Sequence, residues 1–205
     1  MSRSCEEDPA FDYLLALFLE ATGQRLTVLP THRIVRGLGD EGVSRLLGGL
    51  DGLFEVRRGV EAAELRSVFD AIGLAEGGEG RFGLWTRQGG SVLSARRGAV
   101  EPYLPAGGAA LRGLDVTLFS VAIGRLAGIG DEAVAGGAIG YTKSAGEAIA
   151  AVDSGRGGAA AAFLLEPTPV ASISAVASDG DVMPQKSTYF YPKALSGLVI
   201  NPLEW

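Results

Sequence analysis

Apolar residues in the first half of the chain follow the two-residue period of strands in several places. Apolar runs around a glycine-containing turn within Tyr13–Leu29 predict a hairpin, and a helix that starts at Asp8-Pro9 is the competing interpretation. A proline then interrupts the second strand, which is expected to resume at Ile34-Val35. Arg81–Thr86 and Ser91–Ala95 predict a second hairpin across a turn that contains two glycines. The first half therefore predicts antiparallel pairing.

Three segments show the spacing of an amphipathic helix instead. Val43–Leu50 carries a short apolar stripe, for which Asp40 is the expected N-terminal cap. Leu65–Ile72 carries a second stripe and is expected to end at Gly73, because glycine readily adopts the left-handed conformation that closes many helices. The longest stripe runs over Leu114–Ile129.

The last ninety or so residues combine strand and helix signals in alternation. Ala138–Tyr141 predicts a short strand, Ser144–Glu147 is a capping box that opens a helix, and Ala159–Leu165 is an apolar run suited to a strand buried on both faces. A strand, a helix and a strand in this order imply a parallel pair with a right-handed crossover. We therefore predict an α/β fold with a mixed sheet, with antiparallel hairpins in the first half and a parallel βαβ unit in the second.

Length and charge limit the class of protein. The 205 residues fit one α/β domain, with Glu101–Arg112, which holds two prolines and two glycines, as the candidate sub-boundary. A formal net charge of −6 argues against a nucleic-acid partner, which would need a basic surface. The longest stretch without a charge, Pro167–Ser178, is shorter than the roughly 20 residues of a membrane-spanning helix, so no membrane partner is expected.

Single residues exclude further classes of site. One cysteine, Cys5, excludes an internal disulfide, and one histidine, His32, excludes the usual zinc clusters, so no metal site is predicted. Glu6, Glu7 and Asp8 stand where a secretory signal would carry positive charge, and a cytoplasmic protein is therefore expected.

A glycine-rich loop matches the spacing of a dinucleotide-binding fingerprint. Gly37-Leu38-Gly39-Asp40-Glu41-Gly42 lies between a predicted strand and a predicted helix. Its two variable positions are acidic, however, and would repel the pyrophosphate that such a loop holds. We interpret it as a glycine turn into the helix.

The histidine lies in a polar stretch of the early strand. Thr31, His32 and Arg33 combine a hydroxyl, an imidazole and a guanidinium, which together suit a phosphate or a carboxylate. The pKa of an unperturbed imidazole is near neutrality, so His32 could also act alone as an acid or base. A structural histidine that bonds to the backbone is the alternative.

The densest polar cluster is Met183–Lys193, in which lysines and hydroxyls alternate with aromatic residues. Its flanking prolines favour an extended path, so side chains should alternate between two faces. An aromatic strand that packs on the core is the alternative. We expect this segment to approach the one around His32, because such groups form a site only when they converge. The candidate ligand-binding residues of the cluster are Lys186, Ser187, Thr188, Tyr189 and Tyr191.

Four segments resemble the bacterial domain-of-unknown-function 1015 family. They are Leu29–Val35, Tyr141-Thr142 with the capped helix after it, Phe163–Val170 and Met183–Lys193, and they occur in the family's order. The resemblance implies that the chain is the C-terminal half of a longer architecture, whose N-terminal half carries an Asp-Gly-His-His-Arg type segment that is missing here. It also implies that the protein acts on or binds phosphorylated small metabolites. Family genes often neighbour serine-biosynthesis genes, and the ParB-like superfamily, which has a similar segment, includes a free-serine kinase.

Three functional hypotheses follow from the sequence. The leading one is a half of a metabolic protein that binds a small anionic metabolite and is incompletely catalytic alone. The second is a phosphotransferase that acts on serine or phosphoserine. The third is a structural domain that docks a separate N-terminal half of the family architecture or a second copy of the chain. Neither a reaction nor a cofactor can be named from the sequence.

Overall fold

The structure, a computed structural model, describes residues 16, 18, 27–70, 80–193 and 197. It divides into two units, of which one holds Val28–Tyr189 and the other holds Met1–Thr27 together with Phe190–Trp205. The hairpin predicted over Tyr13–Leu29 and the competing helix at Asp8-Pro9 lie almost wholly outside the described residues, as does Gly73.

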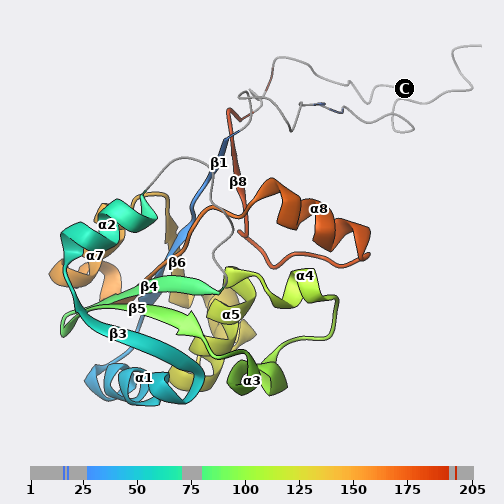
Figure 1. The fold of residues 1–205 in the computed structure, drawn as a ribbon. Helices are drawn as coiled ribbons and strands as arrows, with labels where there is room; N and C mark the ends of the chain where they lie inside the picture. The colour runs from blue at the N-terminus through green and yellow to red at the C-terminus, as the bar shows by residue number, and fades with distance from the viewer. Residues whose placement is uncertain (1–15, 17, 19–26, 71–79, 194–196, 198–205) are drawn as a thin grey trace, which may run out of the picture. The chain divides into compact units, whose positions relative to one another are not determined.

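A six-stranded sheet forms the centre of the larger unit, in the order β3-β5-β4-β7-β2-β6 (Figure 1). Every pair of neighbouring strands in it is antiparallel. β1 (Thr27–Leu29) and β8 (Tyr189–Tyr191) form a separate two-stranded sheet. The strands of the main sheet are β2 (His32–Arg36), β3 (Phe54–Val60), β4 (Arg81–Thr86), β5 (Gly89–Ala95), β6 (Ile139–Thr142) and β7 (Ala159–Leu164).

The predicted parallel βαβ unit is wrong. β6, α7 (Ala145–Ser154) and β7 follow one another as expected, but β2 lies between the two strands and pairs antiparallel with both. Ile34 of β2 is opposite Gly140 on one side and Ala162 on the other. The first four residues of β2 are buried, so this strand needs a neighbour along each edge. A local pattern over residues 138–165 cannot reveal that a strand from far upstream fills the gap.

Helices cover both faces of the sheet. α2 and α7 pack over Ile34 and Leu164 on one face, and α1 and α5 pack over Val35 and Phe163 on the other. The helices α1 and α2 run over Asp40–Leu53 and Ala62–Phe69. The remaining helices are α3 (Arg97–Val100), α4 (Ala109–Arg112), α5 (Asp115–Ala122), α6 (Asp131–Ala133) and α8 (Val170–Ser178). Short 3-10 or π-helical turns are η3 (Glu101–Tyr103), η4 (Ile123–Ala127), η5 (Val134–Ala138) and η6 (Arg156–Gly158).

Local signals agree with several of these elements and miss others. The hairpin of β4 and β5 is confirmed, with only Arg87 and Gln88 in its turn. Asp40 does not cap α1, because Gly39 occupies the N-cap and Asp40 is already helical. Ser144 caps α7 as predicted, since its hydroxyl accepts from the Glu147 amide at 3.2 Å. The Glu147 carboxylate does not complete the box: it accepts from the Thr142 hydroxyl instead, at 2.5 Å.

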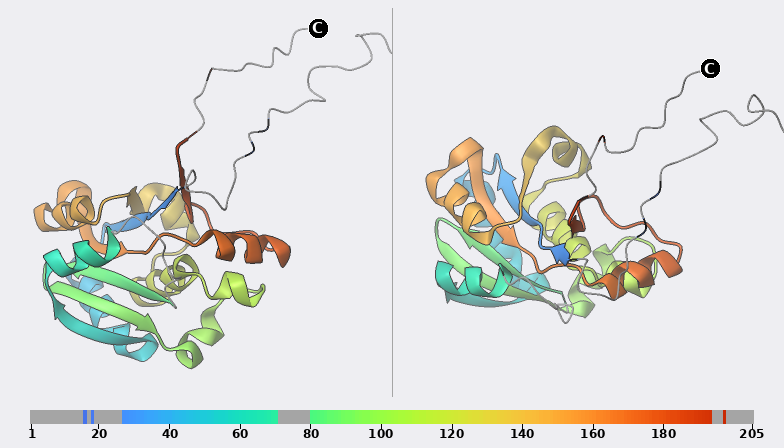
Figure 2. Two further views of the ribbon diagram at one scale, coloured as in Figure 1. Left: turned by 45° about the horizontal axis from the view of Figure 1, so that its top comes forward. Right: turned by 90° about the horizontal axis from the view of Figure 1, so that it is seen from above.

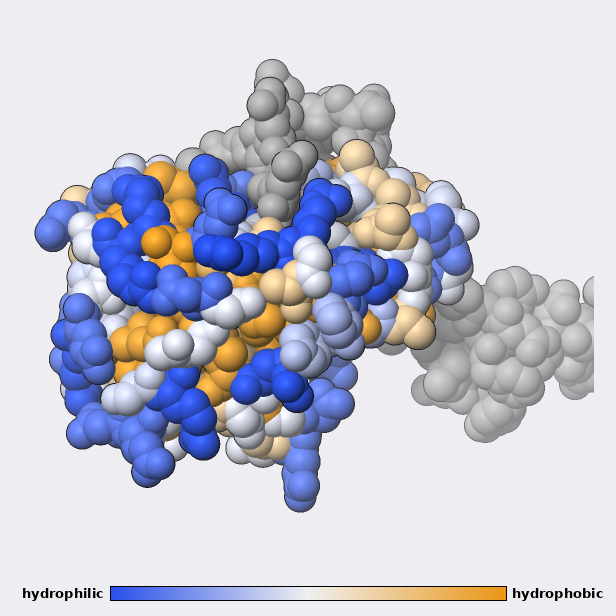
Figure 3. Space-filling model, turned by 60° about the horizontal axis from the view of Figure 1, so that its bottom comes forward, coloured by the Kyte–Doolittle hydropathy of each residue, from blue (hydrophilic) through white to orange (hydrophobic). Residues whose placement is uncertain are grey.

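The candidate sub-boundary, residues 101–112, holds η3 and α4. α8 packs on α4 in the same unit (Figure 2), and the Gly108 amide donates to the Asp181 carboxylate at 2.6 Å. On the face shown in Figure 3, hydrophobic residues form a band between hydrophilic ones. Within residues 27–70 and 80–193, no helix is both long and apolar enough to cross a membrane.

Candidate functional site

The side chains of β2 alternate between two different environments. Ile34 belongs to the apolar cluster under α2 and α7, whereas Val35 belongs to the cluster under α1 and α5. Because successive strand residues point to opposite faces, His32 shares the face of Ile34 and Arg33 shares the face of Val35. The two strongest candidate residues of the early strand therefore cannot line one pocket together.

His32 is held as a neutral, structural histidine. Its side chain is fully buried, and its Nδ1 accepts a hydrogen bond from the Leu165 amide at 3.2 Å. An accepting Nδ1 places the ring proton on Nε2, which lies 3.7 Å from Oδ1 of Asp70. Burial lowers the pKa of His32 to about 4, against the opposing effect of the Asp70 carboxylate. This is the structural alternative that the sequence left open.

Asp70 links this histidine to a helix. Its Oδ1 accepts from the backbone amide of Ala145, the first residue of α7, at 2.6 Å. A carboxylate at this position satisfies an amide that no helical carbonyl can reach and interacts favourably with the helix dipole. The polar groups around His32 are thus used to fix α7 on the sheet.

Arg33 is a buried cation on the opposite face. Arg33 is only 2% exposed. Its guanidinium lies over the Phe119 ring, with 5.5 Å between the carbon Cζ and the ring centroid. Nη1 donates to the carbonyl of Thr31, and Nη2 donates to the carbonyl of Lys186 at 3.1 Å. Burial lowers the pKa of Arg33 to about 10, so the side chain stays protonated at neutral pH.

No carboxylate among the described residues forms an ion pair with Arg33. The nearby Asp115 is itself poorly solvated: burial, and next the charge of Glu166, raise its pKa to about 7. Asp115 is therefore protonated in a large part of the molecules at neutral pH, and its negative charge balances Arg33 only in part. A buried charge is costly unless an opposite charge or hydrogen bonds compensate it.

A cavity of about 530 Å³ lies beside Arg33. Arg33 on β2 and Tyr141 on β6 are directly opposite each other in the sheet and form part of its wall. The polar lining residues are Arg33, Ser120, Asp131, Tyr141, Gln185 and Lys186. Apolar lining residues include Val116, Phe119, Ile123, Ile129, Val134 and Ile139.

The predicted approach of the two polar segments is confirmed by the hydrogen bond from Arg33 to the Lys186 carbonyl. Lys186 does not lie in an extended strand, however. It occupies a turn with a φ of 59°, so the alternation of faces expected over Met183–Lys193 fails at this point. Its side chain is exposed, and the residue lines the cavity.

The other predicted residues lie around this turn or elsewhere. The Ser187 hydroxyl donates to the carbonyl of Pro184, and the Ser187 carbonyl accepts from the Thr168 hydroxyl at 2.9 Å. Thr188 is half-buried. The Tyr189 ring lies 3.5 Å below the Lys143 ammonium, measured to its centroid. Tyr191 belongs to the smaller unit and is 58% exposed.

The sequence analysis missed several residues of this cavity. Phe119 and Ser120 lie within the longest apolar stripe and Asp131 follows it, but the stripe predicted only an amphipathic helix. Tyr141 was placed on a strand without a role. A signal for Tyr141 would have been its pairing opposite Arg33, but that register depends on the insertion of β2 beside β6.

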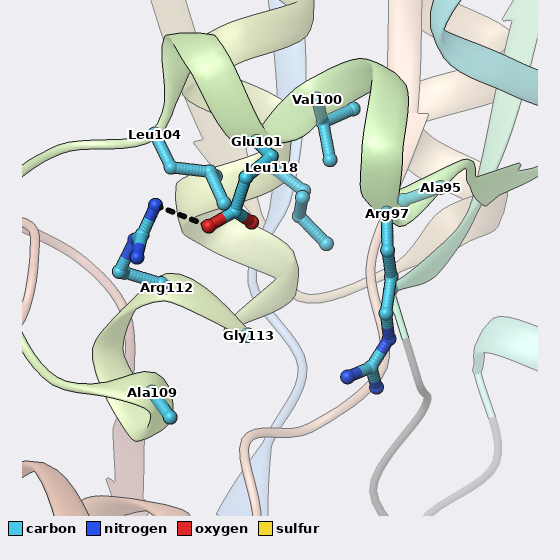
Figure 4. Close-up of a pocket in the computed structure, with 10 residues that line it drawn as sticks. Ala95, Arg97, Val100, Glu101, Leu104, Ala109, Arg112, Gly113 and Leu118 are labelled. Atoms are coloured by element: carbon cyan, nitrogen blue, oxygen red, sulfur yellow. Dashed lines mark hydrogen bonds and ion pairs between the residues drawn. The ribbon is translucent and has the colours of Figure 1, made fainter.

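A second, smaller cavity of about 180 Å³ lies between α3, α4 and α5 (Figure 4). Its wall carries two arginines, Arg97 and Arg112, and Nη2 of Arg112 is 2.7 Å from Oε1 of Glu101. The charge of Arg112 is therefore already paired within the chain. Arg97 is exposed, so solvent screens its charge. Arg33 is buried and has no ion-pair partner among the described residues, and this difference makes the larger cavity the better candidate for an anionic ligand.

The glycine-rich loop does not form a dinucleotide site. Gly37 takes a φ of 74° and its amide donates to the Gly158 carbonyl at 3.0 Å, so the glycine-rich loop is a turn that leads into α1. No group of three or more histidine, cysteine or acidic residues, within the residues that the structure describes, could hold a metal ion.

Comparisons with known proteins give a limited result. No family model matches the sequence, and no curated protein is similar to it. Among solved structures, the chain is similar to a mutant free serine kinase in complex with AMP, with a TM-score of 0.48, 19% identity and 85% of this chain covered. It is also similar to a free serine kinase without that mutation, again in complex with AMP, with a TM-score of 0.47, 21% identity and the same coverage of 85%. The matched region spans 57% of the length of each of these two chains.

Proposed function

We propose that this chain binds a small anionic metabolite in the cavity beside Arg33, with a phosphate or carboxylate as the charged group. The observation that carries the proposal is an arginine that is 2% exposed, borders a cavity and has no ion-pair partner among the described residues. A ligand anion would supply the missing charge. The planar guanidinium suits both phosphate and carboxylate groups, because it presents several N–H donors in one plane.

Lys186, an exposed residue of the cavity lining, supports the same proposal. Its carbonyl helps to hold Arg33 in place, and its exposed ammonium lies on a residue that lines the cavity. In water an exposed charge contributes less than a buried one, because solvent screens it. We therefore assign the anion mainly to Arg33 and give Lys186 a secondary role.

Phosphotransfer to serine or phosphoserine is the second candidate, and the resemblance to the domain-of-unknown-function 1015 family motivates it. The charge of Arg33 would also serve this reaction, since a guanidinium stabilises negative charge on a transferring phosphoryl group. AMP and ADP are suitable probes for it, because a phosphotransferase of this kind would bind a nucleotide. Serine phosphorylation with ATP by the isolated chain would support this candidate.

Calorimetric titration at fixed low salt tests the proposal, with inorganic phosphate, O-phosphoserine, AMP and ADP as probes. Arg33→Gln is expected to weaken the binding of the tightest probe by about ten- to a hundredfold, because a charge-assisted hydrogen bond is lost. Lys186→Ala should weaken it by only about threefold. Arg58→Gln is the control, since Arg58 is an exposed strand arginine that already pairs with Asp51 at 2.6 Å.

Equal losses in Arg33→Gln and Arg58→Gln would mean that only the overall charge attracts anions. Binding of no probe by the folded wild-type chain would contradict the proposal and favour the third hypothesis, a domain that docks another chain. Circular dichroism of each variant shows whether it has folded.

A further inference from the structure

We infer that the ligand of the larger cavity carries an apolar body behind its anionic group, as an aryl or alkyl phosphate or carboxylate does. This inference rests on the proposed function and names the class of ligand more narrowly. It distinguishes such ligands from inorganic phosphate and from strongly polar anions such as phosphoserine.

The walls of the cavity carry the inference. Five of its apolar residues are buried, and they come from α5, η4, β6 and the segment after η4. Val134 of η5 adds a half-buried apolar side chain. A polar ligand could not replace the water beside these walls with favourable contacts, whereas an apolar group gains free energy roughly in proportion to the area it buries. The five buried residues are Val116, Phe119, Ile123, Ile129 and Ile139.

The size of the cavity points the same way. Its volume of about 530 Å³ is within the range of roughly 300–1,000 Å³ that is usual for sites of organic ligands. A phosphate ion at Arg33 would occupy only a small part of this space. The remainder is bordered mainly by the apolar residues, so the part of the ligand that fills it should be apolar.

The distribution of polar groups gives the ligand an orientation. Arg33 is the buried charge of the lining, whereas Asp131, Gln185 and Lys186 are exposed. The anionic group therefore belongs beside Arg33 and Phe119, and the exposed polar residues remain for solvent or for a polar end of the ligand. The exposed charged and polar residues of the lining would not favour a purely apolar molecule without an anionic group.

A series of phosphates that differ only in their body tests this inference by calorimetric titration. Phenyl phosphate should bind the wild-type chain at least about tenfold more tightly than inorganic phosphate, because the ring buries apolar area. O-phosphoserine should bind no more tightly than inorganic phosphate. Equal affinities of the three probes would overturn the inference and leave the proposed function intact, whereas no binding of any probe would overturn both.

A pair of matched variants locates the apolar contact. Val134→Thr keeps the side-chain shape but adds a hydroxyl to the wall, so it should reduce the affinity for phenyl phosphate by about threefold and leave that for inorganic phosphate unchanged. Val68→Thr is the control, because Val68 is another half-buried helical valine that packs on the opposite face of the sheet. Equal effects of the two variants on phenyl phosphate would contradict the assignment.

Discussion

His32 and Arg33 are consecutive residues of one strand and both are buried, but they lie on opposite faces of the sheet and differ in charge. On one face, His32 bonds to the Leu165 amide, faces Asp70 and has lost its charge. On the other face, Arg33 keeps its charge, bonds to two carbonyls and borders a cavity.

The difference shows how burial can separate a structural polar residue from a candidate ligand-binding one. A residue that serves only the fold can be neutral, as His32 is with its Nδ1 bonded to the Leu165 amide. A buried charge without an internal counter-charge is tolerated where something from outside can compensate it. The face with the cavity is therefore the functional face in our account, although His32 has the more familiar catalytic side chain.

The pH dependence of stability should differ in sign between the two faces, and this is the largest effect that we expect on the free energy of unfolding. The pKa of His32 lies at about 4, below its ordinary value of 6.5, so its contribution is present above pH 6.5 and is lost as the pH falls towards 4. The pKa of Asp115 is about 7, above its ordinary value of 3.8, so its contribution is present at low pH and is lost as the pH rises towards 7. Each change should reach at most about 4 kcal/mol.

Urea unfolding of two variants between pH 4 and 7 separates these contributions. Relative to the wild type, His32→Asn should gain stability as the pH falls, because it has no buried imidazole to protonate. Asp115→Asn should gain relative stability as the pH rises, because it has no buried carboxyl to ionise. Differences that do not vary with pH, or that vary in the reverse direction, would contradict the assigned environments.

Replacement of His32 and replacement of Arg33 by apolar residues should lower the free energy of unfolding by different amounts. His32→Leu leaves the Leu165 amide without an acceptor and should lower the free energy of unfolding by about 2 kcal/mol. Arg33→Met should change the free energy of unfolding by less than about 1 kcal/mol, because removal of the buried charge offsets the loss of its two hydrogen bonds. Urea unfolding at pH 7 without ligand gives both values. A larger loss for Arg33→Met would indicate that Arg33 serves the fold rather than a ligand.

Local elements could be predicted from the sequence, but the order of the strands could not. The β4–β5 hairpin, the Ser144 cap and the helix that this cap opens follow from periodicity and turn residues within a few positions. The insertion of β2 between β6 and β7 depends on contacts between residues more than a hundred positions apart. A short-range pattern contains no information on such pairing.

The candidate site was predictable only in part for the same reason. Arg33 and Lys186 stood out because cations beside hydroxyls suggest an anion site, and their segments do meet. The separation of His32 from Arg33 follows from strand alternation, but which face has the cavity depends on α5 and η5. The turn at Lys186 was missed because a positive φ at a residue other than glycine is uncommon.

The central claim is that Arg33 itself contacts the ligand anion, and nitrogen NMR of arginine side chains tests this most directly. The Nε and Nη resonances of Arg33, assigned with the Arg33→Lys variant, should shift in a saturable way as phenyl phosphate is added. Those of Arg58 should stay unchanged. If phenyl phosphate binds while the Arg33 resonances do not move, the ligand lies elsewhere and the assignment of Arg33 is wrong.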